Sequence, residues 1–403
     1  MTEANHIEAT HTEADYNHHS PEIAQDPYSF LAEVRGKCPL GHSNELGGFY
    51  FPTTYDGVKR VFAEYRTFSS ADGAGLPDQL VRLLPVDLDP PSHTRWRRVL
   101  NRFFTQEAAE ADRPRIQGLA DELIDAFAAR GNADLVNELT RPFLAMTTLP
   151  VLGVPLSDRQ MLSEKLLWMV HHRLNDHDGW VQRYGEIAAY LTNLVAERRT
   201  ATERRDDLLQ CLIEEEFDGR MLTDTEGYQV LILALFGALD STSSAMSGSL
   251  YHLGEHPQDK QRLLSGEVPW QGAIEEFLRF TTPIQALRRT VTTETELDGG
   301  IVRPGDFVLA INGAANRDPA KFADPDQCII SRDAREHMSF GTGAHICIGR
   351  HYARVMIDIC LKTVLRRIGD YRIVDGFEPD YTSSEARALK TLPVTFTPSP
   401  VAS

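Results

Sequence analysis

Apolar residues recur every three or four positions through the middle of the chain, from about residue 105 to 285. The segment IQGLADELIDAFAARG has this spacing and ends at Gly131, a residue type that commonly follows the last turn of a helix. Glycine, aspartate and proline separate the apolar segments from one another. The pattern therefore predicts a mainly helical middle part.

Short runs rich in β-branched and aromatic residues lie before and after this helical part, and such runs predict strands. The runs are 47–54 (GGFYFPTT), 288–297 (RRTVTTETEL), 307–313 (FVLAING), 371–374 (YRIV) and 392–398 (LPVTFTP). We therefore expect a mainly α protein with small peripheral β-sheets. No repeat and no Gly/Ser- or Pro-rich linker divides the chain, so residues 21–403 are expected to form a single domain.

The segment 225–253 (TEGYQVLILALFGALDSTSSAMSGSLYHL) predicts an unusually long helix, apolar around most of its circumference up to residue 239. Such a helix must run through the core. Asp240 and the hydroxyl residues 241–244 at its centre argue against a membrane span. Hydroxyl side chains weaken a helix by competing for its backbone hydrogen bonds, so their position here needs another reason.

The charge balance excludes some partners. The 403 residues include 41 basic and 58 acidic side chains, which gives a net charge of -17. This argues against a general nucleic-acid or anionic-membrane binder. An anionic partner would have to meet a local basic patch.

The cysteines and the N-terminus suggest a cytoplasmic protein. The five cysteines are widely spaced and include no C-x-x-C pair for zinc, dithiol redox chemistry or c-type haem attachment. The first twenty residues contain no apolar run, so neither a signal peptide nor a membrane anchor is expected. We expect residues 1–20 to be a disordered polar tail. The alternative is a metal site formed by its histidines, which are His6, His11, His18 and His19.

The segment 340–349 (FGTGAHICIG) places a cysteine among glycines. Glycines at 341, 343 and 349 let the backbone approach a flat, bulky group or turn where a Cβ would clash. Cys347 lies just before the predicted helix RHYARVMIDICLKTVLRR, whose first N–H groups favour a thiolate. That thiolate could be a nucleophile or a metal ligand, and His345 is the one nearby candidate for a general base.

This segment resembles the haem-ligating loop of the cytochrome P450 family, F-G-x-G-x-H-x-C-x-G, at every fixed position. The resemblance implies that Cys347 is the thiolate ligand of haem b iron, where it promotes O–O cleavage. It also implies that Phe340, Gly341 and Gly349 contact the haem. The haem would lie buried between the long central helix and the helix after the cysteine loop. An inert buried cysteine is the alternative.

Further stretches resemble the same family. In AIEEFLRF, Glu276 and Arg279 match its E-x-x-R pair, and Arg332 matches the arginine that joins them; the implied role is structural. His93 and Arg97 in DPPSHTRWRRVL match haem-propionate contacts. The resemblance also assigns Arg289 and His345 to the propionates, with Arg288 as the alternative to Arg289.

In the central helix, GALDST resembles the site where the family places an acid and an alcohol beside a glycine for proton delivery during oxygen activation. The resemblance assigns Asp240 and Ser241 to this relay next to Gly237. The family's usual alcohol is threonine, so Ser241 is a departure, and Thr242 is the alternative hydroxyl. Asp240 could instead be paired away from the haem.

The chain has no flavin or nicotinamide motif and no iron–sulfur cysteine set. The resemblance therefore implies electrons from a ferredoxin and its NAD(P)H-dependent ferredoxin reductase. A basic patch near the cysteine loop could dock the ferredoxin, with Asp358 as its acidic neighbour, or could simply be a solvated helix face. The patch consists of Arg350, Arg354, Lys362, Arg366 and Arg367.

Family analogy also suggests the substrate pocket. The expected lining residues are Val81, Leu83, Leu84, Leu233, Phe236, Gly237, Ile284 and Ala286. This apolar lining favours a small hydrophobic substrate such as a terpenoid or aromatic compound. Arg82 leaves room for a carboxylate. The expected activity is O2-dependent hydroxylation or epoxidation, as in the camphor-hydroxylase type of bacterial enzyme. The alternatives are oxidative tailoring of a larger or carrier-bound natural product and a haem-binding sensor.

Overall fold

The computed structural model describes residues 11–77 and 81–398. The helices are α1 (Pro21–Gln25), α2 (Pro27–Lys37), α3 (Tyr55–Ala63), α4 (Ser92–Leu100), α5 (Gln106–Ala111), α6 (Arg113–Ala128), α7 (Arg141–Leu152), α8 (Arg159–His172), α9 (His177–Thr200), α10 (Leu208–Glu214), α11 (Asp224–Leu239), α12 (Ser241–Glu255), α13 (Pro257–Leu264), α14 (Trp270–Thr281), α15 (Asn312–Asn316) and α16 (Arg350–Ile368). The strands are β1 (Thr12–Glu13), β2 (Leu40–Ser43), β3 (Phe49–Pro52), β4 (Phe68–Ser69), β5 (Asn132–Asp134), β6 (Ala286–Val291), β7 (Thr295–Leu297), β8 (Gly300–Val302), β9 (Phe307–Ile311), β10 (Arg372–Ile373) and β11 (Pro393–Thr395).

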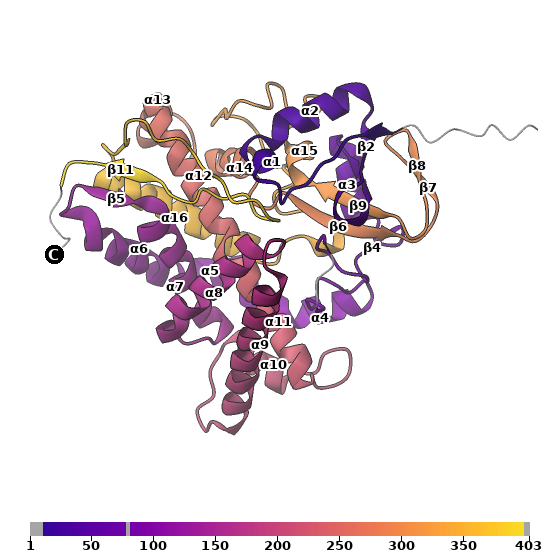
Figure 1. Cartoon of the computed structure of the whole chain (residues 1–403). Coiled ribbons are helices and arrows are strands. Elements are labelled where there is room, and N and C mark those ends of the chain that lie inside the picture. The colour runs from indigo at the N-terminus through magenta and orange to yellow at the C-terminus, as the bar shows by residue number, and fades with distance from the viewer. Residues whose placement is uncertain (1–10, 78–80, 399–403) are drawn as a thin grey trace, which may run out of the picture.

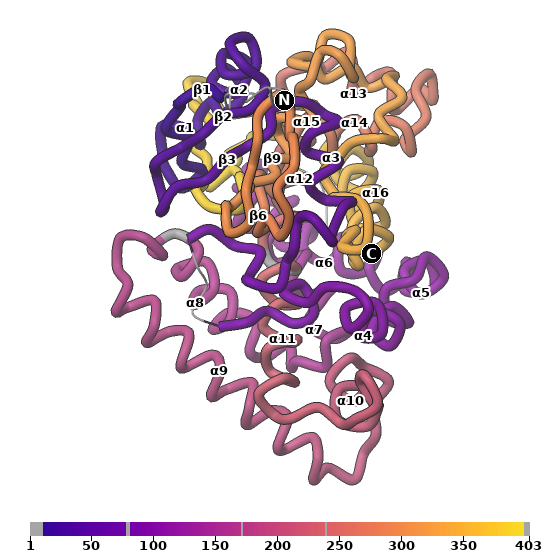
Figure 2. The backbone as a smooth tube through the Cα atoms, turned by 90° about the vertical axis from the view of Figure 1, so that its right-hand side faces the viewer, coloured from indigo at the N-terminus to yellow at the C-terminus, as the bar shows by residue number. Residues whose placement is uncertain are grey.

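Helices dominate the molecule, and the strands form small sheets, as predicted. The largest sheet has the order β1-β2-β3-β9-β6-β4, and the smaller ones have the orders β10-β11-β5 and β7-β8. The largest sheet lies at the opposite end of the molecule from α9 and α10 (Figures 1 and 2). Strands from distant parts of the sequence therefore pair, which a mainly local sequence pattern does not reveal.

The central helix is interrupted where its hydroxyl residues begin. The expected helix over 225–253 is two helices, α11 and α12, because Asp240 has φ −129° and ψ −41°. The side chain of Ser241 donates a hydrogen bond to the carbonyl of Gly237 at 3.0 Å. The hydroxyl thus satisfies a carbonyl at the break.

The two central helices lie mainly in the core, as expected. The span Asp224–Glu255 is long and apolar enough to cross a membrane, but 69% of its most apolar stretch is buried inside the molecule. The helix α16 packs against α6, α12 and α14. The helix that follows the cysteine loop is therefore held in the core beside α12, the second of the central helices.

The N-terminal segment differs from the expected tail. Residues 12 and 13 form β1, which pairs in parallel with β2. Tyr16 is fully buried, and His18 and His19 are also buried. Residues 11–20 are therefore ordered, because apolar contacts of Tyr16 outweigh the polar composition that suggested disorder. Residues 1–10, including His6, lie outside the described residues.

Glu276, Arg279 and Arg332 form a buried charge cluster, as the resemblance implied. The Nε and Nη2 atoms of Arg279 donate to the two carboxylate oxygens of Glu276, at 2.7 and 2.8 Å, and Arg332 Nε donates to Glu276 at 3.1 Å. Arg279 also donates to the carbonyls of Asn316, Pro325 and Gln327. The cluster therefore ties α14 to the chain that leads into the cysteine loop.

We expect Glu276→Gln to lower the free energy of unfolding by about 3–5 kcal/mol, because it leaves a buried guanidinium without its counter-charge. Urea denaturation followed by circular dichroism measures this change. Glu267→Gln is the matched control, since Glu267 pairs with Arg262 on the surface at 2.7 Å, and such pairs contribute about 0–1 kcal/mol. Equal effects of both substitutions would contradict a structural role for the buried cluster.

Candidate active site

One cavity of about 480 Å³ brings most of the expected site residues together. It lies among α4, α11, α12, β6 and the cysteine loop. The expected residues that line it are Val81, Leu83, Leu84, His93, Arg97, Leu233, Phe236, Gly237, Asp240, Ser241, Thr242, Ile284, Arg289, Phe340, Gly341, His345, Cys347 and Gly349.

The cysteine loop reaches the cavity because its glycines permit a tight path. Gly343 has φ +70°, and a Cβ there would lie 2.9 Å from the backbone of α3, at Phe62 O and Ala63 Cα. The N–H of Cys347 donates to the carbonyl of Phe340 at 2.8 Å. These contacts hold the thiol against the cavity, directly before the N-terminus of α16.

Opposing effects act on the Cys347 thiol. Burial raises its pKa, whereas the N–H of Gly349 and the positive charges of Arg97, Arg350 and Arg354 lower it. The nearby positive charges favour the thiolate form of Cys347. A bound metal cation would favour the thiolate further, because a thiol that coordinates a metal is deprotonated. Cys347 is thus suited to act as a metal ligand.

The expected propionate-binding residues, two arginines and two imidazoles, form a cluster in which none has an ion pair with an acid among the described residues. The rings of His93 and His345 lie 3.9 Å apart, and the Nδ1 atoms of both are buried without a partner. Arg97 donates to Asn101, and Arg289 donates to the carbonyl of Arg288, while Arg289 Nη2 is buried and unsatisfied.

Burial lowers the pKa values of the arginine and the two imidazoles that face the cavity. Burial lowers the pKa of Arg289 to about 10 and that of His345 to about 2. Burial, with the charge of Arg97, also lowers the pKa of His93 to about 4. Such a set of unsatisfied donors favours binding of an anionic group.

The strand β6 decides two of the expected assignments. Arg289 lines the cavity, whereas Arg288 turns to the carbonyls of Asp72 and Gly73. Ala286 does not line the cavity: it is buried in the core beneath the largest sheet, and Leu287 lines the cavity instead. Alternate residues of a strand share a face. Leu287 therefore lies on the same face of β6 as Arg289, and Ala286 lies on the opposite face.

Asp240 is buried at the break between α11 and α12, and neither of its carboxyl oxygens has a hydrogen-bond partner within residues 11–77 and 81–398. Burial raises its pKa, against the opposing charge of Arg141. The alternative of an Asp240 paired away from the haem is therefore not met among the described residues. An unpaired buried acid is costly and is typical of functional sites.

Both candidate hydroxyl residues line the cavity beside Asp240. The hydroxyl of Ser241 donates its hydrogen bond to the Gly237 carbonyl. Thr242 is buried one residue further along α12. The hydroxyl oxygen of Ser241 can still accept a hydrogen bond, so either side chain can serve beside the acid.

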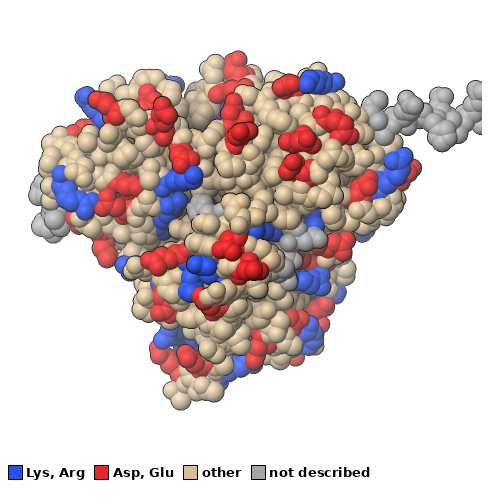
Figure 3. Space-filling model, in the orientation of Figure 1, with Lys and Arg blue, Asp and Glu red and all other residues tan. Residues whose placement is uncertain are grey.

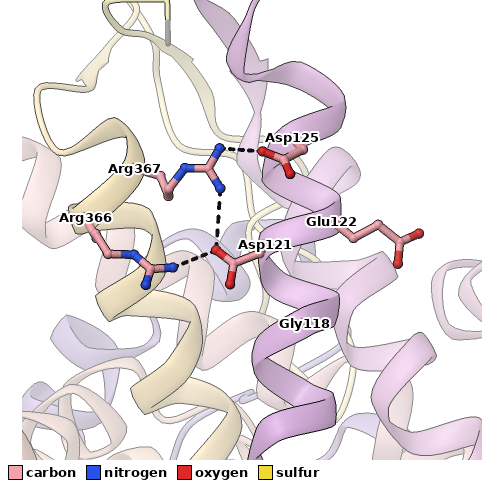
Figure 4. A pocket seen from close by; sticks show the side chains of 6 residues that line it. All are labelled: Gly118, Asp121, Glu122, Asp125, Arg366 and Arg367. Carbon is pink, nitrogen blue, oxygen red and sulfur yellow. Dashed lines mark hydrogen bonds and ion pairs between the residues drawn. The ribbon is translucent and has the colours of Figure 1, made fainter. Parts of the chain in front are cut away.

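The basic patch on α16 has more acidic neighbours than expected. Figure 4 shows Arg366 and Arg367 of α16 paired with Asp121 and Asp125 of α6. Lys362 pairs with Asp358 at 2.5 Å. Asp121 and Asp125 come from α6, which packs against α16 only in the tertiary structure, so local spacing indicates Asp358 alone.

Arg354, from the same patch, pairs with Glu275 at 2.6 Å, and Glu275 also contacts His337 at 3.1 Å. Arg354 also lies over the ring of Phe340, 4.6 Å from its centroid. The side chains of Arg354, Glu275 and His337 therefore pack next to the first residue of the cysteine loop, Phe340. With these ion pairs, the basic patch on α16 is largely neutralised. On the face of the molecule drawn in Figure 3, acidic and basic side chains are interspersed.

Some cavity residues carried no recognisable sequence signal. Arg173 and Glu385 form an ion pair in the cavity wall, although they lie 212 positions apart. Tyr184 also lines the cavity. Arg82 does not line the cavity and donates instead to the carbonyl of Asp87 at 2.7 Å. These side chains reach or miss the cavity wall because of the tertiary fold, which the local sequence pattern does not show.

The donor set fits a haem. An apolar cavity holds one thiol, and at its edge lie unsatisfied cations and imidazoles suited to two carboxylates. The class of protein that this site defines is a haem-thiolate enzyme.

Comparisons with known proteins agree. The cytochrome P450 family profile matches residues 51–265 and 270–368. A steroid C26-monooxygenase of Mycobacterium tuberculosis (strain ATCC 25618 / H37Rv) is 30% identical over 407 residues, which cover 99% of each protein. The 6-deoxyerythronolide B hydroxylase of Saccharopolyspora erythraea is 30% identical, covering 85% of this chain and 88% of that protein.

Among solved structures, CYP109E1 from Bacillus megaterium in complex with testosterone has a TM-score of 0.85 and 28% identity. The match covers 94% of this chain and 100% of that chain. The chain therefore belongs to the cytochrome P450 family and is a cytochrome P450 monooxygenase. The family implies a haem cofactor, and the non-enzyme alternative of a haem sensor is not supported.

Proposed function

We propose that this enzyme hydroxylates or epoxidises a hydrophobic substrate, such as a terpenoid or aromatic compound, with O2 and two electrons. The observation that carries the proposal is the unpaired, buried acid Asp240 in the same apolar cavity as the thiol of Cys347. Haem b, when bound, would supply the oxygen-activating chemistry with the thiolate as its iron ligand.

The side chains divide the remaining work. Arg97, Arg289 and the two imidazoles would hold the haem carboxylates and fix the orientation of the haem. Asp240 would hold a proton at its carboxyl group, with Ser241 or Thr242 passing it on. Leucine and phenylalanine side chains of α11 would exclude water and place the substrate.

We further propose that a ferredoxin and its NAD(P)H-dependent reductase supply the electrons, in the cytoplasm. The chain lacks a flavin or nicotinamide motif of its own. Cys211, Cys328, Cys347 and Cys360 are free thiols in the described part of the chain, which suits a reducing compartment. Arg350 precedes the paired basic residues on α16 and has no ion-pair partner in the part of the chain that the structure describes, so the docking surface would centre there. We also propose that residues 21–403 act as one catalytic domain.

A larger substrate is the second candidate. The cavity reaches Trp180 and Tyr184 on α9 and Leu208 on α10. Its wall also holds the Arg173–Glu385 pair, which could bind a hydroxyl or keto group. Two relatives are named for a steroid and for 6-deoxyerythronolide B. A steroid or another large natural product, including a carrier-bound one, would use this outer part.

The proposal is tested by titrating the ferric protein with terpenoids, aromatic compounds, steroids and fatty acids. A low-to-high-spin shift with one class, followed by product formation with ferredoxin, reductase and NAD(P)H, is expected. The reduced protein with CO should show the red-shifted Soret band of thiolate ligation. A histidine-type CO spectrum would contradict the function.

Leu233→Trp tests the cavity itself. The larger ring would fill the space above the haem seat and weaken binding of the best ligand about 10- to 100-fold, corresponding to about 1–3 kcal/mol of overpacking. Leu264→Trp is the matched control, because Leu264 is 57% exposed. Equal affinities in both variants would place the substrate elsewhere.

A further inference from the structure

Three potential metal ligands meet on the edge of the largest sheet, far along the chain from the cysteine loop. His11, Glu13 and His42 have ligand atoms that all lie within 4.8 Å of one another. His11 Nε2 lies 2.8 Å from Glu13 Oε1, and His42 Nδ1 lies 3.1 Å from Glu13 Oε2. Nothing in the proposed oxidation uses these side chains.

The backbone places the three side chains on one face. Glu13 of β1 is the direct register partner of His42 of β2. His11 precedes Glu13 by two residues, and residues two apart in an extended strand share a face. Figure 2 shows β1, β2 and β3 side by side. Strand pairing, rather than a flexible loop, therefore brings the ligands together.

Ring contacts orient the imidazoles. Tyr50 of β3 is the register partner of His42, and the two ring centroids lie 4.7 Å apart. Tyr50 also meets His11 edge-on at 5.6 Å, and the Nδ1 of His11 is buried with no hydrogen-bond partner in the part of the chain that the structure describes. Such contacts restrict the rings in advance, which lowers the cost of binding.

The distances suit a small dication. Zinc binds imidazole nitrogen at about 2.0–2.1 Å and carboxylate oxygen at about 2.0–2.2 Å, so ligand atoms in a tetrahedral site lie about 3.3–3.4 Å apart. The two observed contacts with Glu13, at 2.8 and 3.1 Å, are shorter than that spacing by about 0.2–0.6 Å. Two imidazoles and one carboxylate are a donor set that zinc accepts, with water in the fourth position.

The surroundings are favourable for a cation. The side chain of Glu13 is 59% exposed, which leaves room for a water ligand. Asn44 donates to Glu13 Oε2 at 3.2 Å and would hold the carboxylate from outside. Asp15 accepts a hydrogen bond from the Asn44 N–H, so a second acid lies next to the site. In the turn between β8 and β9, Asp306 raises the pKa of Tyr50 and Arg303 lowers it, so both signs of charge lie near this ring.

A second cluster, His18, His19 and Glu385, is less suitable. Its carboxylate already pairs with the guanidinium of Arg173. A dication there would be repelled by this neighbouring charge. From the ligand geometry, strand register and charge, we propose that His11, Glu13 and His42 bind one divalent transition-metal ion, with Zn²⁺ as the expected occupant, which fastens β1 to the sheet.

The test is calorimetric titration of the haem-loaded, untagged and chelator-treated protein with ZnCl2. One tightly bound Zn²⁺ per chain is expected, together with a higher melting temperature, because the ion binds only where β1 is paired. Glu13→Gln keeps the shape of the side chain, and His42→Ala removes a ring. Each should weaken binding more than about 100-fold, since losing even an outer partner of a metal ligand costs about 10- to 100-fold.

His177→Ala is the control, since His177 is exposed at the start of α9, and it should bind Zn²⁺ as the unchanged protein does. The reduced-CO spectrum should be the same in all variants, which separates this site from the haem site. Zinc binding that survives both Glu13→Gln and His42→Ala would overturn the proposal. So would binding that is lost only in Glu385→Gln, because the ion would then occupy the second cluster.

Discussion

The Cys347→His variant should keep part of its haem but form no product. An imidazole can ligate iron, but it lacks the negative charge through which a thiolate donates electron density. The cations near residue 347 would also act against a protonated ring. Haem content, the position of the reduced-CO Soret band and product yield measure the three parts of this prediction.

Cys38→Ser is the control for this experiment, because Cys38 does not line the cavity. It should retain both the thiolate-type CO spectrum and product formation. Product formation by Cys347→His at the rate of the unchanged protein would rule out Cys347 as the iron ligand. A complete loss of haem in that variant would show that the loop cannot accommodate the larger ring, and Cys347→Ser would then be compared.

Asp240→Asn should slow turnover about 10²- to 10⁴-fold, the usual contribution of a positioned acid or base. The amide has the same shape but cannot release a proton, so haem binding and the substrate-induced spin shift should be unchanged. The rate of product formation with saturating ferredoxin, reductase and NAD(P)H is the measurement. A turnover rate equal to that of the unchanged protein would move the proton-delivery role to another side chain.

Stability provides a second readout for Asp240→Asn. Burial raises the pKa of Asp240, so the folded protein holds its proton more tightly than the unfolded chain does. The carboxyl group therefore costs stability increasingly as the pH rises above its unfolded-state pKa. The amide removes this cost, and the variant should unfold at an equal or higher urea concentration at neutral pH.

Single substitutions at the neighbouring hydroxyls identify the proton carrier. If Ser241 carries the proton, Ser241→Ala should waste NAD(P)H, while Thr242→Val should leave coupling unchanged. The opposite result would select Thr242. Both residues line the cavity, and Ser241 is the one that donates to the carbonyl at the helix break.

The sequence identified the residues whose chemistry is local. Phe340 to Gly349 form a loop that only a short list of residues can build, since Gly343 needs both a positive φ and the absence of a Cβ beside α3. His93 and Arg97 lie four apart on one helix, and Glu276 and Arg279 lie three apart on another. Helical periodicity alone brings such pairs to a common face.

Several features could not be read from the sequence, because they depend on which elements are neighbours. Ala286 was expected in the cavity, but the pairing of β6 with β9 turns Leu287 there instead. The basic residues of α16 were expected to be nearly unpaired, but α6 supplies Asp121 and Asp125. The polar tail was expected to be disordered, but β1 pairs with β2.

By itself, the sequence determined a mainly helical fold, a thiol in a glycine-rich loop and an acid in the middle of an apolar helix. These depend on spacing within a few residues and on side-chain chemistry. The tertiary structure decided the outer wall of the cavity, the charge balance around α16 and the meeting of His11, Glu13 and His42. Each of these brings together residues distant in sequence, and no local periodicity encodes which strand or helix lies next to another.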